Sequence, residues 1–314
     1  MDEVDVRIAQ LLMRNSRTPY RVLADHLNIS LQAVHSRIQS LTKAGIIRGF
    51  TATLSPSYLG AIGIDVVGAA NLSRSEEWVR TLGRNEFVVD VFLGAGGSVF
   101  IRGLLRKPSD LERLLEFMRT TGHLTDIWVG LQSFGLAGRQ RMDDDAESGK
   151  ITTIDFRILN ALRADSRKPI SEIADQVGVS TKTVARRLNR MIEDRMITLP
   201  IKWFPGMASG VVTYLQIRLK QGADKIPTAA ALADKYSPRI VFLGSYSNFP
   251  DLLGAIAWTP TPVAQNELTM ELTKEQSVVR VTPYVLLKKY EFDTWADNMI
   301  TEGALGRGGV KSED

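Results

Sequence analysis

Cysteine is absent from this chain of 314 residues, and histidine occurs only at His26, His35 and His123. Without cysteine the chain has no disulfide, no thiolate nucleophile and no metal site that needs sulfur. Three histidines are too few for us to expect a metal site built from imidazoles alone. The sequence therefore predicts neither a metal ion nor a cofactor.

Long apolar runs are also lacking. No stretch approaches the roughly 18 uninterrupted apolar residues of a membrane-spanning helix, and the acidic, amphipathic start MDEVDVRIAQ differs from a signal peptide. We therefore expect a cytoplasmic protein with no membrane partner. Apolar residues make up 44% of the chain and charged residues 24%, a globular composition, so at this length we expect two to four domains.

Positive charge is concentrated in two segments, although the net charge is only +4. Residues 1–50 contain seven basic and four acidic residues, and residues 151–202 contain ten basic and six acidic residues. The rest of the chain is therefore negative overall. Clustered basic residues are typical of surfaces that bind a polyanion, so both segments are candidate nucleic-acid-binding regions.

The two basic segments are copies of each other. Without a gap, many residues of the first segment return 150 positions later. The matches are Asp5/Asp155, Arg7/Arg157, Ile8/Ile158, Leu12/Leu162, Ser16/Ser166, Arg17/Arg167, Pro19/Pro169, Ala24/Ala174, Asp25/Asp175, Ser30/Ser180, Val34/Val184, Arg37/Arg187 and Ile47/Ile197. Chance does not place so many matches in one register, so the sequence predicts one structural unit used twice.

Each copy has the pattern of three short helices. In the first copy, Val4, Ile8 and Leu12 recur on one face with a helical period. The turn before the third helix ends at Ser30, whose hydroxyl can cap that helix by accepting a hydrogen bond from a free amide. The equivalent turn of the second copy contains Gly178, which tolerates a left-handed backbone. This pattern predicts a helix-turn-helix.

The third helix of each copy combines a buried apolar stripe with a polar outer face. The outer residues are Gln32, His35, Ser36 and Gln39 in the first copy and Lys182, Arg186, Asn189 and Arg190 in the second. Amides and guanidiniums on such a face can contact base edges and phosphates in a major groove, which predicts double-stranded DNA as a partner. Arg37 and Arg187 are expected at backbone phosphates, and Arg48 and Lys202 are further candidate DNA contacts.

A strand-rich pattern follows each helix-turn-helix. Residues 45–54 indicate a wing strand, and because Arg195 and Leu199 replace its glycines, the second wing is expected to differ in shape. The order βαββαβ then predicts a ferredoxin-like domain. The expected strands are 62–70, 87–93, 98–105 and 126–134, then 211–219, 240–246, 252–258 and 278–290; the expected helices are 75–84, 109–120, 228–236 and 262–273.

The predicted fold class is therefore α+β, with two winged helix-turn-helix domains that are each followed by a ferredoxin-like domain. The winged domains are expected at residues 1–54 and 151–204, and the ferredoxin-like domains at 58–137 and 208–292. Residues 138–150 are polar and predict a linker, and the Gly-rich residues 301–314 predict a disordered tail.

This arrangement closely resembles the Lrp/AsnC family of prokaryotic regulators. The most specific marks are Asp5, Ile8, Val34, Arg37, Ile38, Leu41, Gly45, Ile46, Ile47 and Gly49. The resemblance implies that the ferredoxin-like domains pair face to face, either within one chain or between two chains. It also implies a small-molecule effector at that interface, because some members bind amino acids there.

Two loops are the candidate effector loops: the glycine-rich Gly94, Gly96, Gly97 and Ser98, and Gly244, Ser245, Ser247 and Asn248. The family's loop usually has an aspartate shortly after its glycine, and neither loop has this acid, so an ammonium group would lose its expected partner. The first loop does not open a helix or end in Gly-Lys-Ser/Thr, which argues against a nucleotide loop. A tight hairpin turn is the alternative interpretation.

Three functions are compatible with these features. The favoured hypothesis is a sequence-specific transcription regulator whose two unlike readers contact an asymmetric site if the domains pair within the chain, or palindromes if they pair across chains. Sirohaem decarboxylases resemble the same module and are the enzymatic alternative, although two of the three histidines here lie in a helix-turn-helix. A scaffold or metabolite sensor that does not bind DNA is the third.

Overall fold

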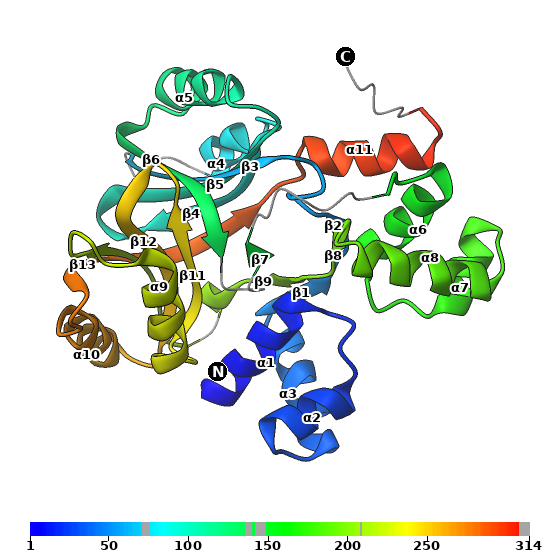
Figure 1. Ribbon diagram of the computed structural model, residues 1–314, viewed down its shortest axis with the longest axis horizontal. Coiled ribbons are helices and arrows are strands. Elements are labelled where there is room, and N and C mark those ends of the chain that lie inside the picture. Colours follow the sequence, from blue (N-terminus) through cyan, green and yellow to red (C-terminus); the bar gives the residue numbers. More distant parts are fainter. Residues whose placement is uncertain (71–75, 136–139, 142–148, 208, 308–314) are drawn as a thin grey trace.

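The computed structural model describes residues 1–70, 76–135, 140–141, 149–207 and 209–307 (Figure 1). The first helix-turn-helix consists of α1 (Glu3–Arg14), α2 (Tyr20–Leu27) and α3 (Leu31–Lys43), and the second of α6 (Thr153–Arg163), α7 (Ile170–Val177) and α8 (Thr181–Glu193). Among the described residues, no helix combines the length and apolar composition that crossing a bilayer requires.

The predicted caps explain where these helices begin and end. Ser30 and Ser180 each accept a hydrogen bond from the backbone amide three residues later, at 3.1 and 3.2 Å, and so satisfy one free donor of α3 and α8. The preceding helices are followed by the C-cap residues Asn28 and Gly178, which both have a left-handed backbone. The two turns therefore have the same shape.

Two ferredoxin-like domains form the main body of the molecule. The first contains β3 (Ile62–Ala69), α4 (Glu76–Leu82), β4 (Val88–Gly94), β5 (Ser98–Leu105), α5 (Asp110–Thr120) and β6 (Thr125–Gly135). The second contains β10 (Val211–Leu219), α9 (Lys225–Lys235), β11 (Ile240–Tyr246), β12 (Phe249–Thr259), α10 (Pro262–Thr273) and β13 (Val278–Glu291). Short elements are the 3₁₀ helices η1 (Ala95–Gly97) and η2 (Pro205–Met207), and β7 (Gln140–Arg141), which pairs with β6.

The two domains pair with each other within the chain. Their sheets have the strand orders β4-β5-β3-β6 and β11-β12-β10-β13, and they are joined at both edges, because β13 pairs with β4 and β11 pairs with β6. The inner faces share one apolar core, in which the rings of Phe100 and Tyr214 stack at 4.5 Å. Of the two arrangements left open by the sequence, the structure has the intrachain pair.

Strands form within the predicted wing segment, and they pair across the two modules, which the sequence did not predict. Strand β1 (Ile47–Phe50) pairs with β9 (Ile201–Trp203), and β2 (Thr53–Leu54) pairs with β8 (Ile197–Thr198). The sequence predicted that the second wing would differ in shape because Arg195 replaces a glycine. At the turn that contains Arg195, this prediction is wrong. Arg195 adopts φ 53°, close to the 70° of Gly45, so a non-glycine residue makes the same left-handed turn.

A C-terminal helix that the sequence did not predict ties the second helix-turn-helix to the first ferredoxin-like domain. Helix α11 (Trp295–Ala304) lies along α6 (Figure 1), and its Ile300 is buried in the core of the second helix-turn-helix. At its other end Trp295 donates a hydrogen bond to the Leu104 carbonyl at 2.8 Å. The predicted disordered tail, residues 301–314, therefore begins too early, because α11 extends to Ala304. Residues 308–314 and most of the predicted linker 138–150 lie outside the described residues.

Replacement of Ile300 with alanine tests this docking. Because the side chain is fully buried, the loss of its methyl and methylene groups should lower the free energy of unfolding of the second helix-turn-helix by about 2–5 kcal/mol. Denaturant unfolding followed by circular dichroism measures the change. Asn298→Ala, at an exposed position of the same helix, is the matched control. Equal stability of the two variants would contradict a docked α11.

Candidate nucleic-acid interface and an adjacent cationic cleft

The outer faces of the two recognition helices are exposed as predicted. Gln32, His35, Ser36 and Gln39 project from α3, and Lys182, Arg186 and Asn189 project from α8. Beneath them Val34, Ile38 and Leu41, and Val184, Leu188 and Met191, are buried. The helices are thus held by their apolar stripes while hydrogen-bonding groups face outward. The DNA contacts of these side chains stay a prediction.

Three arginines of the predicted DNA surface form ion pairs within their own domains. Arg37 contacts Asp2 and Asp5, both at 2.8 Å, and Arg187 and Arg190 contact Asp155 at 3.0 and 2.8 Å. These pairs join each recognition helix to the first helix of its domain. The sequence carried a signal for this role, because Asp5 and Arg37 are both retained in the second copy.

The environment of Asp155 favours its charged form. Burial alone would raise the pKa of this carboxyl group, but hydrogen bonds from the Thr152 backbone and hydroxyl, together with the contact to Arg187, hold the pKa below its ordinary value of 3.8. A lowered pKa in the folded state means that ionised Asp155 stabilises the domain above the ordinary pKa. This stabilisation is lost as the pH falls through the lower, folded-state pKa.

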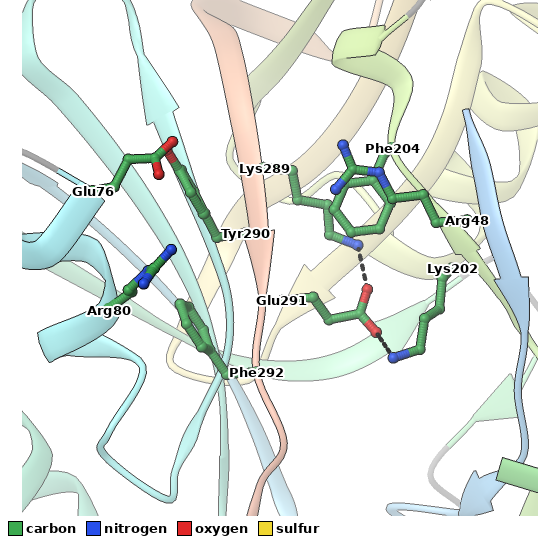
Figure 2. Close-up of a pocket in the computed structure, with 9 residues that line it drawn as sticks. All are labelled: Arg48, Glu76, Arg80, Lys202, Phe204, Lys289, Tyr290, Glu291 and Phe292. Carbon is green, nitrogen blue, oxygen red and sulfur yellow. Dashed lines mark hydrogen bonds and ion pairs between the residues drawn. The ribbon is translucent and has the colours of Figure 1, made fainter. Parts of the chain in front are cut away.

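A cleft next to the recognition domains contains the two remaining predicted DNA contacts. The cleft has a volume of about 310 Å³ and is lined by Arg48, Glu76, Arg80, Lys202, Phe204, Lys289, Tyr290, Glu291 and Phe292 (Figure 2). Arg48 comes from β1 and lies 4.0 Å from the centre of the Phe204 ring, and Lys202 comes from β9. The structure therefore places Arg48 and Lys202 in one cleft with residues of β13.

Charges in the cleft form a chain that leads into the body of the protein. Lys202 and Lys289 contact the Glu291 carboxylate at 3.3 and 3.4 Å (Figure 2), and Lys289 contacts Asp90 at 3.2 Å. Burial, with the neighbouring charge of Arg102, lowers the pKa of Lys289 to about 8, although Glu291 opposes the shift. Four cations and two carboxylates line the cleft, so its wall is positive overall.

The two predicted effector loops lie at the seams between the sheets. Gly94 pairs with Leu286 across one seam and Gly244 with Gly135 across the other. The second seam is closed further by Ser245, whose hydroxyl lies 2.9 Å from that of Ser133. Neither loop contributes to the cationic cleft. In the first loop Gly96 and Gly97 both have positive φ, which agrees with the tight-turn interpretation.

The remaining residues of the two loops form hydrogen bonds across the seams or within their own turn. The side chain of Asn248 accepts a hydrogen bond from the Leu131 amide at 2.8 Å and donates one to the Val129 carbonyl at 2.9 Å. The Ser247 amide donates to the Leu131 carbonyl at 2.8 Å, and Ser98 bonds within its own turn to the Ala95 carbonyl. These groups join the two domains or shape the turns, which is a structural role.

A buried polar group that the sequence did not predict spans the inner faces of the two sheets. Tyr246 donates a hydrogen bond to Asp65 at 2.7 Å, and the hydroxyls of Tyr246 and Tyr214 lie 2.9 Å apart. Gln132 also donates to Asp65, at 2.8 Å. Burial raises the pKa of Asp65, while these hydrogen bonds oppose the shift. The available signal was an aspartate within the otherwise apolar strand IGIDVVGA.

The variant Asp155→Asn tests the ion pairs of the second recognition helix. At pH 7 it should lower the free energy of unfolding by about 1–3 kcal/mol, because two arginines lose a buried, hydrogen-bonded carboxylate. The difference from the unmodified protein should shrink as the pH falls below 3.8, the ordinary pKa of the group. Urea unfolding at several pH values measures both effects. Asp175→Asn changes an aspartate at an exposed site and is the control. If the loss of unfolding free energy persists at low pH, or if Asp175→Asn causes the same loss, the ion pairs of Asp155 are not its cause.

Comparisons with known proteins agree with the duplicated architecture. Residues 1–48 match the model of a winged helix-turn-helix DNA-binding domain, and residues 151–192 match the AsnC-type helix-turn-helix domain. The uncharacterized HTH-type transcriptional regulator PH0061 of Pyrococcus horikoshii is 34% identical over 137 residues, which cover 42% of this chain and 93% of that protein. The regulator AldR of Mycobacterium tuberculosis is 32% identical over 38% of this chain and 67% of its own.

Solved structures of one enzyme match both modules together. The siroheme decarboxylase NirDL is similar over 97% of this chain and 99% of its own, with a TM-score of 0.60 and 13% sequence identity. At this identity the likeness concerns the fold, and it shows that two such modules on one chain form a recurring architecture. The matched domains, the relatives that share one module and the repeated fold lead to one conclusion: the chain belongs to the Lrp/AsnC family and carries the family's module twice.

Proposed function

We propose that this protein is a sequence-specific DNA-binding transcription regulator in which one chain supplies both readers of an asymmetric site. The observation that carries the proposal is the presentation of two exposed recognition helices with different outer residues on one paired frame. In the regulators of this family that match one module, a single chain carries one copy of what occurs here twice.

The outer residues of the two helices suit different tasks. Gln32 and Gln39 of α3 carry amides that can read base edges, with donors and acceptors on one group. Lys182 and Arg186 of α8 carry full positive charges that bind phosphates strongly and guanine selectively. We therefore expect the first helix to contribute mostly selectivity and the second to contribute most of the affinity.

The salt dependence of DNA binding tests this division. In the double variant Lys182→Ala with Arg186→Ala, loss of two phosphate contacts should weaken binding and reduce the slope of log K against log salt by up to about 1.8. Gln32→Ala with Ser36→Ala is the matched control, because these positions lie at the same places on α3. It should reduce sequence discrimination with the slope unchanged. Arg187 and Arg190 are left intact because they pair with Asp155.

The assay uses fragments that the protein selects from a random DNA pool, at several salt concentrations. An unchanged slope in the α8 variant would contradict the assignment of Lys182 and Arg186. If no fragment is bound in a salt-dependent way, the proposal of a DNA-binding regulator fails, and the third hypothesis, a scaffold or sensor without DNA, takes its place.

A second candidate function is catalysis on a tetrapyrrole, which the full-length match to a siroheme decarboxylase favours. A related structure of that enzyme holds an iron-uroporphyrin III analogue, which carries many carboxylates. The cationic cleft offers Arg48, Arg80 and Lys202 to such groups, and Phe204 and Tyr290 offer aromatic surface. Its volume of about 310 Å³ is at the low end of the range for small-molecule sites, roughly 300–1,000 Å³.

Spectral titration with iron-uroporphyrin III separates the two candidates. Binding in the cleft would give a saturable shift of the tetrapyrrole absorption band, and Arg48→Ala with Arg80→Ala would abolish it, because both guanidiniums line the cleft. Arg14→Ala with Arg21→Ala removes the same charge from exposed positions and serves as the control. For a DNA-binding regulator we expect no saturable shift. A saturable shift that only the cleft variant removes would favour the enzymatic candidate.

A further inference from the structure

The two helix-turn-helix domains meet at a pair of residues that the repeat has kept identical. The hydroxyl oxygens of Ser16 and Ser166, which occupy the same position in the two copies, lie 2.6 Å apart, and both side chains are fully buried. Each residue also bonds through its backbone amide to the other module: Ser16 to the Leu199 carbonyl at 2.6 Å and Ser166 to the Phe50 carbonyl at 2.9 Å. The contact is therefore reciprocal.

The arginine after each serine crosses to the opposite domain. Arg17 donates hydrogen bonds to the carbonyls of Ser166 and Lys168 at 2.5 and 3.0 Å, and Arg167 donates to the Thr18 carbonyl at 2.8 Å. Burial lowers the pKa of both arginines, and the charge of Arg167 lowers that of Arg17 further. Holding two like charges together has an electrostatic cost, which the charged hydrogen bonds to carbonyls offset.

This joint continues to one recognition helix. The guanidinium of Arg167 lies 4.3 Å from the centre of the Tyr20 ring, and the Tyr20 ring contacts His35 edge-on with centroids 5.7 Å apart. His35 is exposed on the outer face of α3. The equivalent positions of the second module are Ile170 and Ala185, so no aromatic contact of this kind can form there. The joint therefore contacts the two readers unequally.

We infer that the joint of Ser16, Arg17, Ser166 and Arg167 is a positioning device that fixes the separation of α3 and α8, and so determines which spacing of DNA half-sites the chain accepts. This inference rests on the proposed DNA-binding function. Successive base pairs rotate around the double helix, with about 10–10.5 per turn. Two rigidly joined readers therefore fit half-sites at one spacing, whereas loosely joined readers adapt to several.

The first experiment requires no DNA. Because the chain has no cysteine, Ser36→Cys with Arg186→Cys places one spin label on each recognition helix. Pulsed electron-spin measurements should give one narrow distance distribution, and Arg17→Ala with Arg167→Ala should broaden it at least about twofold. Arg14→Ala, which removes an exposed arginine of α1, is the control and should leave the width unchanged. An unchanged width in folded joint variants would overturn the inference, whatever the protein binds.

The second experiment measures DNA spacing. Starting from a selected site, the segment between half-sites is lengthened or shortened by one, two and five base pairs. The spacing ratio is the affinity for the selected spacing divided by the affinity for an altered spacing. It should be about tenfold or more for the unmodified protein and below about threefold for the joint variant. The joint variant should bind an isolated half-site as before. If the joint variant has the same spacing ratio as the unmodified protein, the joint does not determine the accepted spacing and the inference is overturned.

A third variant covers the case in which the arginine changes unfold the domains. Ser16→Cys with Ser166→Cys places two thiols where the two hydroxyl oxygens are 2.6 Å apart, so oxidation should lock the joint without loss of either arginine. The oxidised form, which carries no spin label, should keep the unmodified spacing ratio. A locked joint that accepts all spacings equally would contradict the inference. Absence of DNA binding together with a narrow distribution in the spin-labelled protein with the native joint would instead disprove only the proposed function.

Discussion

Pairing of the two ferredoxin-like sheets at both edges is the constraint on which the rest of the structure depends. Strand β13 pairs with β4 and β11 pairs with β6, so each domain completes the hydrogen bonding of the other's edge strands. The inner faces then bury one apolar core that neither domain could cover alone. Once the sheets are joined, the strands β1 and β9 that lead into them meet, and the helix-turn-helix domains are brought together.

Local features of the fold could be predicted from the sequence because their causes are local. The serine caps, the helical period of the apolar residues and the alternation in the strands each act over a few residues, and strands β5, β10 and β11 occupy the predicted ranges. The duplication made the inference stronger, since each element was observed twice. Helix α11 was missed because glycine-rich composition in the following segment suggested disorder, whereas Ile300 and Trp295 are ordered by distant partners.

The candidate site was harder to predict, because side-chain roles depend on partners far away in the sequence. A basic helical face gives no indication of whether Arg187 will meet a phosphate or the buried Asp155 of its own domain. The cationic cleft combines residues of β1, α4, β9 and β13, which have no common sequence pattern. The same holds for Asp65 and Tyr246, which belong to different domains and meet only when the sheets pair.

The intrachain pairing also changes how binding would respond to protein concentration. A regulator that must first dimerise occupies its site, at low concentration, in proportion to the square of the number of chains. Here both helix-turn-helix domains are covalently connected and the sheets are already paired within the chain, so this pairing needs no second chain before the proposed binding. Occupancy of a DNA site would then rise in direct proportion to the number of molecules in the cell. For a regulator of the proposed kind, the duplication would replace a sharp, concentration-dependent onset with a response that begins with the first molecule made.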